Sequence, residues 1–216
     1  MSMDIYQLNI NDNLPVVHLQ FFPSVAQLVL FEELGEVSID IYENFPKQTF
    51  RNRAVLLSSQ GLMNIIVPVK SKGKEKQVIK DVEISYSEKW NVEMWRTIFS
   101  CYGKSPYFMY YADKIEQILM AKHKYLMDLN LEVFLFLKKS MNLSCELHIT
   151  SQYIQRQENN FRDMFLPKNR IENGKDLPAY YQCFDEKFSF QTNLSALDLL
   201  FNLGNQSLAY IKSASR

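Results

Sequence analysis

The sequence predicts an α/β protein in which a strand, a helix and a second strand open a small parallel sheet. Three observations lead to this fold class: residues 16–19 form a short, mainly apolar run, a helical pattern follows, and residues 36–41 alternate between apolar and polar side chains. Two strands joined by a helix favour parallel pairing through a right-handed crossover. A further buried strand at 145–149 is expected to return to the same sheet.

The first helix is predicted to begin after Ser24 and to end at Gly35. The Ser24 hydroxyl can cap the free amides of the first turn, and Val25, Leu28 and Val29 supply an apolar face. Glycine is a common residue at a helix end. This helix should therefore be short and should cross over between the two strands.

An antiparallel hairpin and about three helices are expected to extend this unit. Two branched apolar runs, 53–58 and 63–69, are separated by a Ser-Gln-Gly turn, which is typical of a hairpin. Apolar residues then recur at helical spacing over 87–137, with breaks near Gly103 and Pro106. A last helix is predicted with Asn193 as its cap and Gly204 as its end.

The 216 residues are expected to form a single domain, 1–216. Residues 1–14 are polar and mixed, and are interpreted as an N-terminal extension. Residues 155–177 are dense in charged and amide side chains, which predicts an exposed and mobile excursion that could act as a lid.

Composition narrows the function classes. Lysine and arginine (24) balance aspartate and glutamate (24), which argues against a nucleic-acid partner held by overall charge. Three widely spaced cysteines indicate a reducing, cytoplasmic setting. The most apolar early run, 16–31, is broken by polar residues, so no membrane span is expected. Nothing in the sequence indicates an oligomeric state.

The sequence lacks the usual motifs of several kinds of catalytic and binding site. No group of His, Cys and carboxylate residues has metal-ligand spacing, and no metal site is predicted. Neither a glycine-rich phosphate loop nor a Gly-x-Ser-x-Gly elbow is present, and no cofactor is predicted. Cys101 and Cys183 are interpreted as buried thiols rather than nucleophiles.

The stretch from Glu43 to Arg53 is the main candidate site. If the chain after Pro46 is extended, alternate side chains share a face: Lys47, Thr49, Arg51 and Arg53 on one, and Gln48, Phe50, Asn52 and Ala54 on the other. Three cations that project together suit a small anion, because a guanidinium matches carboxylate or phosphate oxygens two at a time. The alternative interpretation is a solvated basic strand.

Three further residues are candidates for the same site. His18 lies near a predicted strand end, where it could bind a ligand, carry a proton or be structural. Asp198 stands on the last helix and needs a partner if it is buried; Arg51 or Arg53 could be its counter-ion, and proton transfer is the other possible role. Tyr107 follows the Ser-Pro break and could line a pocket.

Motifs spread over most of the chain after residue 15 resemble the WbqC-like family, with spacing similar to the subgroup common in Bacteroidetes. The most specific are the Lys-Gln-Thr-x-Arg-Asn-Arg run at 47–53 and the ending Asn-Leu-Ser-x-x-Asp-Leu-Leu-Phe-Asn-x-Gly at 193–204. Many relatives have a Gln-Pro pair before the aromatic-Pro turn, where this chain has His18 and Leu19. Pro46 also replaces a residue that is often polar.

The resemblance implies a transferase of surface polysaccharide (O-antigen-type) biosynthesis that moves an amino-acyl (glycine) or acyl group to a sugar precursor. Its substrate would be a small anion, a nucleotide sugar or an acyl donor. The hypothesis makes His18, Glu43, Lys47 and Asp198 the catalytic candidates. The binding candidates are Arg51, Asn52, Arg53, Gln48, Tyr107, Gln182 and Asn193. The alternative is a non-catalytic module that binds a small anion or a partner. Nucleotidyl transfer is disfavoured because its paired histidines are absent.

Overall fold

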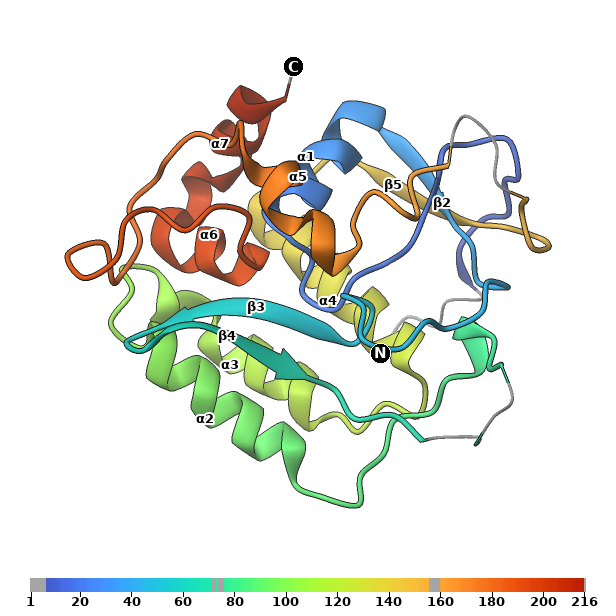
Figure 1. Cartoon of the computed structure of the whole chain (residues 1–216), viewed down its shortest axis with the longest axis horizontal. Helices are drawn as coiled ribbons and strands as arrows, with labels where there is room; N and C mark the ends of the chain where they lie inside the picture. The colour runs from blue at the N-terminus through green and yellow to red at the C-terminus, as the bar shows by residue number, and fades with distance from the viewer. Residues whose placement is uncertain (1–6, 71–72, 74–75, 156–159, 216) are drawn as a thin grey trace.

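The parallel sheet forms as the alternation predicts. The computed structural model describes residues 7–70, 73, 76–155 and 160–215. In it, β1 (Val16–Val17) pairs in parallel with β2 (Glu36–Ile39), and α1 (Val25–Leu34) connects them. β5 (Glu146–Ile149) pairs in parallel with the other edge of β2, so the strand order is β1, β2, β5 (Figure 1). The predicted α/β class is confirmed.

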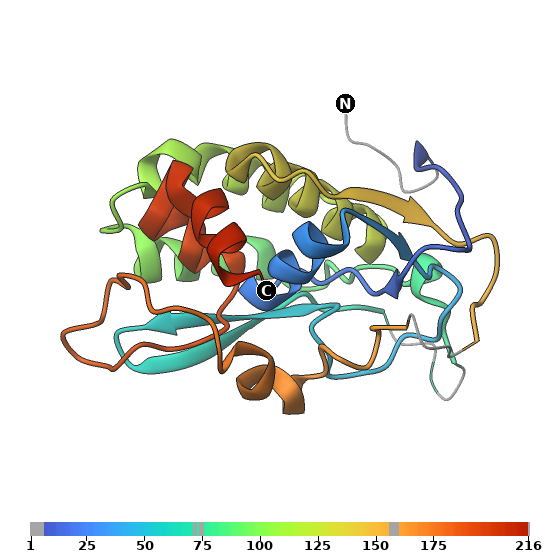
Figure 2. The same cartoon turned by 90° about the horizontal axis from the view of Figure 1, so that it is seen from above.

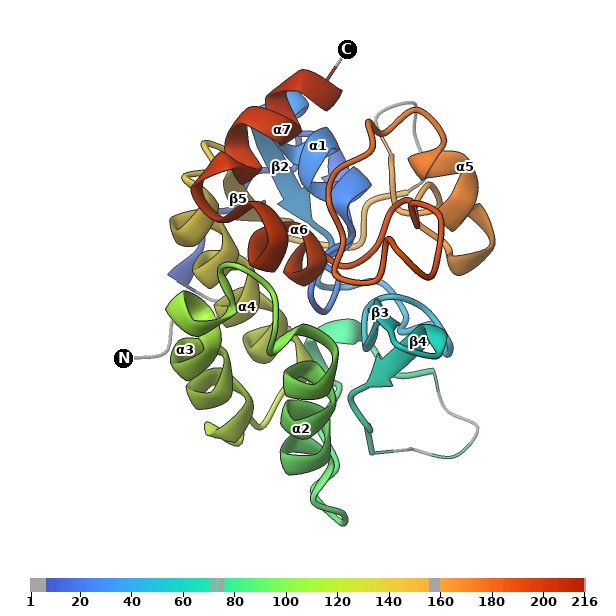
Figure 3. The same ribbon diagram turned by 90° about the vertical axis from the view of Figure 1, so that its left-hand side faces the viewer.

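The hairpin is also confirmed. β3 (Arg53–Ser58) and β4 (Gly61–Ile66) are antiparallel, with Ser58 opposite Gly61. The second strand begins earlier than its apolar run predicts, because the turn contains only two residues. Gly61 has a φ of 106°, a conformation that L side chains rarely adopt. The parallel sheet lies toward one end of the molecule and the hairpin, with its neighbouring helix, toward the other (Figure 3).

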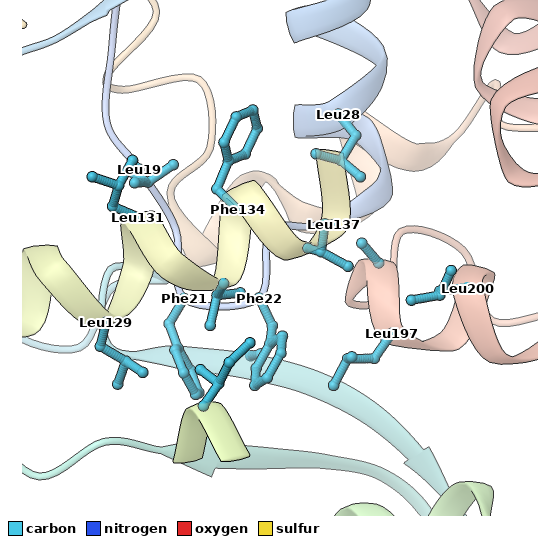
Figure 4. Close-up of a cluster of buried hydrophobic side chains, with 14 of the residues drawn as sticks. Leu19, Phe21, Phe22, Leu28, Leu129, Leu131, Phe134, Leu137, Leu197 and Leu200 are labelled. Carbon is cyan, nitrogen blue, oxygen red and sulfur yellow. The ribbon is translucent and has the colours of Figure 1, made fainter. Parts of the chain in front are cut away.

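Three long helices occupy the predicted helical region: α2 (Trp90–Tyr102), α3 (Phe108–Met120) and α4 (Leu126–Met141). α4 contributes to the centre of the core. Its apolar face packs with side chains from the chain before α1, from α1 and from α6 (Ala196–Leu203) (Figure 4). The labelled side chains are all no more than 1% exposed: Leu19, Phe21, Phe22, Leu28, Leu129, Leu131, Phe134, Leu137, Leu197 and Leu200.

The remaining helices, α5 (Arg170–Gly174) and α7 (Ser207–Ala214), pack against α1. The short α5 lies over α1 on the side away from α4 (Figure 2). Single 3₁₀ turns are η2 (Ile79–Asp81), η3 (Pro167–Asn169) and η4 (Gly204–Gln206). Among the described residues, none of these helices has the length and apolar character to cross a membrane.

The two helix caps are not those that the sequence predicts. Ser24 precedes α1 but makes no side-chain cap; instead Asn193, far away in the sequence, accepts a hydrogen bond through Oδ1 from the Ala26 amide at 3.0 Å. α6 is capped by Ser195, which accepts from the Leu197 amide at 3.3 Å. The predicted end of α6 at Gly204 is confirmed.

Position 204 requires glycine for two reasons: its backbone has a positive φ, and the Tyr107 ring lies close to it. Its φ is 54°, and a Cβ at this position would lie 2.4 Å from a ring carbon of Tyr107. The Tyr107 amide also donates to the Phe201 carbonyl at 3.0 Å. The break between α2 and α3 is therefore fixed against the end of α6.

Parts of the two segments expected outside the core are integrated into the fold. Residues 1–6 and 156–159 of these segments lie outside the described residues. In the N-terminal segment, the Asn11 amide donates to the Ile149 carbonyl at 3.0 Å, alongside β5. In the 155–177 segment, Arg162 and Phe165 are buried at 5% and 2% exposure, so the prediction of an exposed excursion is wrong at these positions. Its mobility stays a prediction.

Candidate functional site

The carboxyl ends of the three parallel strands place three polar side chains at one edge of the sheet. Val17 is level with Ile39, and Ile39 with Ile149, so the next residues, His18, Asp40 and Thr150, follow the strand ends together. All three are at most 2% exposed. Ligands in open α/β sheets bind beyond the carboxyl ends of the strands, and burial of polar groups at this edge is costly unless they are paired.

Asp40 forms a buried ion pair with Arg162 from the 155–177 segment. The Asp40 carboxylate also accepts hydrogen bonds from the Tyr42 amide at 2.9 Å, the Ile154 amide at 3.2 Å and the Thr150 hydroxyl at 3.4 Å. Arg162 donates further to the Ile154 carbonyl and to a side chain two residues before it. The pair therefore ties the chain after β5 to the end of β2.

Arg51 and Glu43 form a second buried ion pair. Both Nε and one terminal nitrogen of Arg51 contact Glu43 Oε1, at 2.7 and 2.6 Å. Burial raises the pKa of Glu43, although the charge of Arg51 opposes this shift, and burial lowers the pKa of Arg51. The charges of Asp40 and Arg162 also act on Glu43, so the two ion pairs are neighbours.

The segment before Arg51 is not the extended strand that the alternation predicts. Residues 47–52 form turns, and Gln48 has a φ of 61°. Lys47 and Gln48 are consequently exposed while Arg51 turns inward, 3% exposed. The predicted three-cation face is therefore wrong, because a turn does not alternate its side chains and the Glu43 carboxylate draws Arg51 into the interior.

His18 lies beside both ion pairs. Burial, and then the positive charge of Arg51, lower the pKa of His18 well below its usual value; the charge of Arg162 acts in the same direction and its backbone opposes the shift. Neither ring nitrogen has a hydrogen bond of normal geometry within the described chain. The ring edge faces Phe165, with centroids 6.4 Å apart. His18 is therefore a neutral imidazole at pH 7, and the Arg162 backbone lies beside its ring.

We call His18, Asp40, Glu43, Arg51 and Arg162 the His18 group. It joins three of the residues that the sequence singles out with two that it does not. The sequence does not indicate Asp40, because the predicted strand runs on to Ile41 and makes Asp40 an ordinary outward residue. It does not indicate Arg162 because the surrounding residues are polar, although Arg162 stands between Phe161 and Phe165, a signal of local burial.

Asp198 belongs to a separate polar group. Its Oδ1 accepts from the Tyr180 hydroxyl at 2.7 Å and from Gln182 Nε2 at 3.1 Å. Burial raises the pKa of Asp198 to about 6, while these donors lower it. The prediction that Arg51 or Arg53 is the counter-ion of Asp198 is wrong. Arg51 pairs with Glu43, and in the described chain Arg53 forms no ion pair with Asp198. In the described part of the chain, no direct hydrogen bond or ion pair links Asp198 to the His18 group.

The other predicted binding residues are dispersed. Asn52 donates through Nδ2 to the Val67 carbonyl at 2.9 Å, and Asn193 uses its amide nitrogen on the Arg170 carbonyl, also at 2.9 Å. Arg53 is half-buried beside a small recess that Asn193 also lines. Tyr107 packs on Gly204 and lies 6.1 Å, between ring centroids, from Tyr110. Their roles in binding stay predictions.

No group of three His, Cys, Asp or Glu side chains in the described ranges is arranged to hold a metal ion. The three cysteines are free thiols. Burial raises the pKa of Cys101 to about 11 and also raises that of Cys183, so neither is an activated thiolate.

Comparison with known proteins covers the motif at 47–53 but not the ending at 193–204. The model of the WbqC-like protein family matches residues 31–176. The chain belongs to the WbqC-like protein family. A search of curated proteins and a search of solved structures each found no match. Four members of the His18 group lie within the range that the WbqC-like family model matches, whereas His18 and Asp198 lie outside it.

Proposed function

We propose that this WbqC-like protein is a transferase of surface polysaccharide biosynthesis and that the His18 group is its catalytic centre. The reaction would move an amino-acyl or acyl group to a sugar precursor. The observation that carries the proposal is the neutral, 2%-exposed imidazole of His18 beyond the end of β1, beside two arginines. A neutral imidazole at the ligand-binding edge of a parallel sheet can accept a proton, as general-base catalysis requires.

The residues suit the steps of acyl transfer. A hydroxyl or amine of the sugar precursor attacks the carbonyl carbon of the acyl donor, and His18 accepts the proton of the attacking group. The new bond to carbon forms as the bond to the leaving group breaks, and His18 returns the proton to that leaving group. Arg51 and Arg162 would stabilise the negative charge that develops on the carbonyl oxygen or is carried by a phosphate.

Glu43 and Asp40 hold the two arginines in place until an anion arrives. The charges within the group balance, so an anionic substrate must share the guanidinium groups with the two carboxylates. Burial raises the pKa of Glu43, so Glu43 could take up a proton as the anion binds. Protonation of Glu43 would free Arg51 to bind the anion. Lys47 and Gln48 lie on the exposed turn before Arg51, where they could contact the outer part of the substrate.

Entry to the His18 group requires movement of the chain that covers it. Residues 160–166 supply both Arg162 and the Phe165 ring that faces His18. Lid movement of this segment would expose His18 and break the Asp40 pair at the same time. We place the reaction in the cytoplasm, where free cysteines are maintained.

A substrate screen tests the proposal against a non-catalytic binding module. Nucleotide sugars and amino-acyl or acyl donors are first screened singly for a thermal shift, and those that stabilise the protein are then mixed in pairs. We expect mass spectrometry of at least one mixture to show a sugar that carries the acyl group. Stabilisation by anions with every mass unchanged would instead establish the binding module.

A further inference from the structure

A pocket lies apart from the His18 group. It has a volume of about 630 Å³ and is lined by the end of α2 and the two residues after it, within 99–104, and by side chains within 181–186, with Ser59 of the hairpin turn at its edge. Figure 1 shows the chain before α6, in orange, reaching the hairpin turn beside α2. The 181–186 wall lies beyond the range that the family model matches, and no member of the His18 group lines this pocket.

Aromatic rings form much of the pocket wall. Phe99 is 54% exposed and Tyr181 is 52% exposed, and Phe184 lines the same pocket half-buried. Single exposed rings are ordinary on protein surfaces, but three that line one concave site form a binding surface. The faces of aromatic rings carry partial negative charge and attract organic cations.

Three carboxylates, Asp185, Glu186 and the buried Asp198, outnumber the two ammonium groups around the pocket, Lys104 and Lys187. Asp185 and Glu186 lie on the 181–186 wall, and Lys104 on the opposite wall is the cation among the lining residues. The ammonium of Lys187, the next residue along the chain, lies at the edge of the pocket, because it donates to the Ser59 carbonyl; it also lies 5.3 Å from the Phe188 ring centroid.

The buried carboxylate of Asp198 lies behind this pocket. Two pocket thiols, Cys101 and Cys183, have a raised pKa. Burial is the largest cause, and the negative charge of Asp198 is a further one. Cys183 also connects the pocket to α6, since its sulfur lies 2.8 Å from Ser105 Oγ and 3.5 Å from Asn202 Oδ1. The floor is thus polar and faces a further negative charge.

We propose that this pocket binds a small organic cation, a molecule with an ammonium group and an apolar body. The ammonium would lie near Asp185 and Glu186, and the apolar body would pack between Phe99 and Phe184. An anionic ligand of the same shape is disfavoured because the two wall carboxylates and Asp198 together outnumber Lys104 and Lys187. The site is separate from the His18 group, so its occupancy does not depend on acyl transfer.

Three probes of similar shape test the charge preference: phenethylammonium, 2-phenylethanol and 3-phenylpropanoate. Calorimetry and ligand-observed NMR on the full chain should show phenethylammonium binding about tenfold more tightly than 3-phenylpropanoate, with the alcohol between them. Equal or tighter binding of the carboxylate would overturn the proposal, as would the absence of phenethylammonium binding at millimolar concentrations.

A pair of double variants assigns the preference to the pocket. D185N/E186Q removes the two wall carboxylates, and E88Q/D113N removes two carboxylates that are also exposed but lie elsewhere. We expect D185N/E186Q to bind the ammonium and carboxylate probes about equally, and the control to keep the wild-type preference. The proposal fails if D185N/E186Q keeps the preference for the ammonium probe or if the control loses this preference. H18Q, which removes the proposed base, should leave the preference for the ammonium probe intact.

Discussion

At the scale of single residues, the His18 group combines charges that are costly to bury with an imidazole that is kept neutral. Arg51 is 3% exposed and its partner Glu43 is 8% exposed. Each would be left as an isolated charge in a low-dielectric interior if the other were removed. The pair is therefore needed for the fold of the 43–53 segment, whatever it does for a substrate.

Arg51→Ala should destabilise the protein by about 3 to 5 kcal/mol, because it leaves the Glu43 carboxylate buried without its counter-ion. Urea denaturation measures this change. Lys70→Ala is the matched control, since Lys70 is 61% exposed and pairs with Glu83 at 2.7 Å; such a surface pair contributes less than about 1 kcal/mol. Equal losses in the two variants would show that burial of the Arg51 pair has no energetic consequence.

Asp198 predicts a specific dependence of stability on pH. Its pKa is raised to about 6 in the folded protein by burial, whereas an unfolded chain has an Asp pKa of about 3.9. The folded state therefore holds the proton more tightly. The stabilising contribution is complete below about pH 4, falls as the pH rises through about 6, and amounts to about 2 to 3 kcal/mol.

Asp198→Asn should remove this dependence. An Asn side chain can still accept from Tyr180 and Gln182 through Oδ1, and its uncharged amide carries no desolvated negative charge. We expect the variant to gain stability relative to wild type between about pH 4 and pH 7, measured by urea denaturation at several pH values. Subtraction of the two curves cancels other titrating groups, such as Glu43. Parallel curves would contradict the raised pKa.

At the scale of elements, α1 is fixed at its amino end by a residue from the far end of the chain. Asn193 caps the Ala26 amide and also donates to the Arg170 carbonyl. Its φ of 52° is a left-handed conformation that Asn tolerates better than Ala. The hydroxyl of Ser24, in contrast, has no hydrogen-bond partner in the described chain.

Asn193→Ala should therefore cost about 2 to 3 kcal/mol, from the lost cap and the left-handed backbone together. Ser24→Ala, at the position that the sequence marks as the cap, should change stability by less than about 0.5 kcal/mol. Thermal or urea unfolding of the two variants compares them directly. A larger loss in the Ser24 variant would mean that the cap is assigned to the wrong residue.

The elements themselves could be predicted from the sequence because they depend on local periodicity. The βαβ opening, the hairpin and the three long helices all follow from the spacing of apolar residues. The caps could not be predicted in this way, since Asn193 and Ala26 meet only after α6 packs against α1. The strand expected after Pro46 failed for a similar reason: an ion pair with Glu43 decides the direction of Arg51, and alternation along the chain does not.

At the scale of the whole molecule, the candidate site is assembled from segments that sequence spacing cannot bring together. His18, Asp40 and Thr150 meet because three parallel strands end at one edge. Arg162 lies in a polar segment that the sequence predicts to be an exposed loop, and it joins the group by pairing with Asp40. Residues 18, 43 and 51 could be selected from the sequence by their chemistry, but the pairing of Glu43 with Arg51, and the presence of Asp40 and Arg162, required the fold.

The central claim is that His18 carries the proton in the reaction, and a comparison of two histidine variants tests it most directly. His148 lies on β5, in the same sheet, and its ring nitrogens also have no hydrogen-bond partner in the described chain. The measurement is the rate of acylated-sugar formation, by mass spectrometry, for wild type, H18Q and H148Q, each verified as folded. We predict a loss of about 100-fold or more for H18Q and a near-normal rate for H148Q. An H18Q protein as active as wild type would contradict the account.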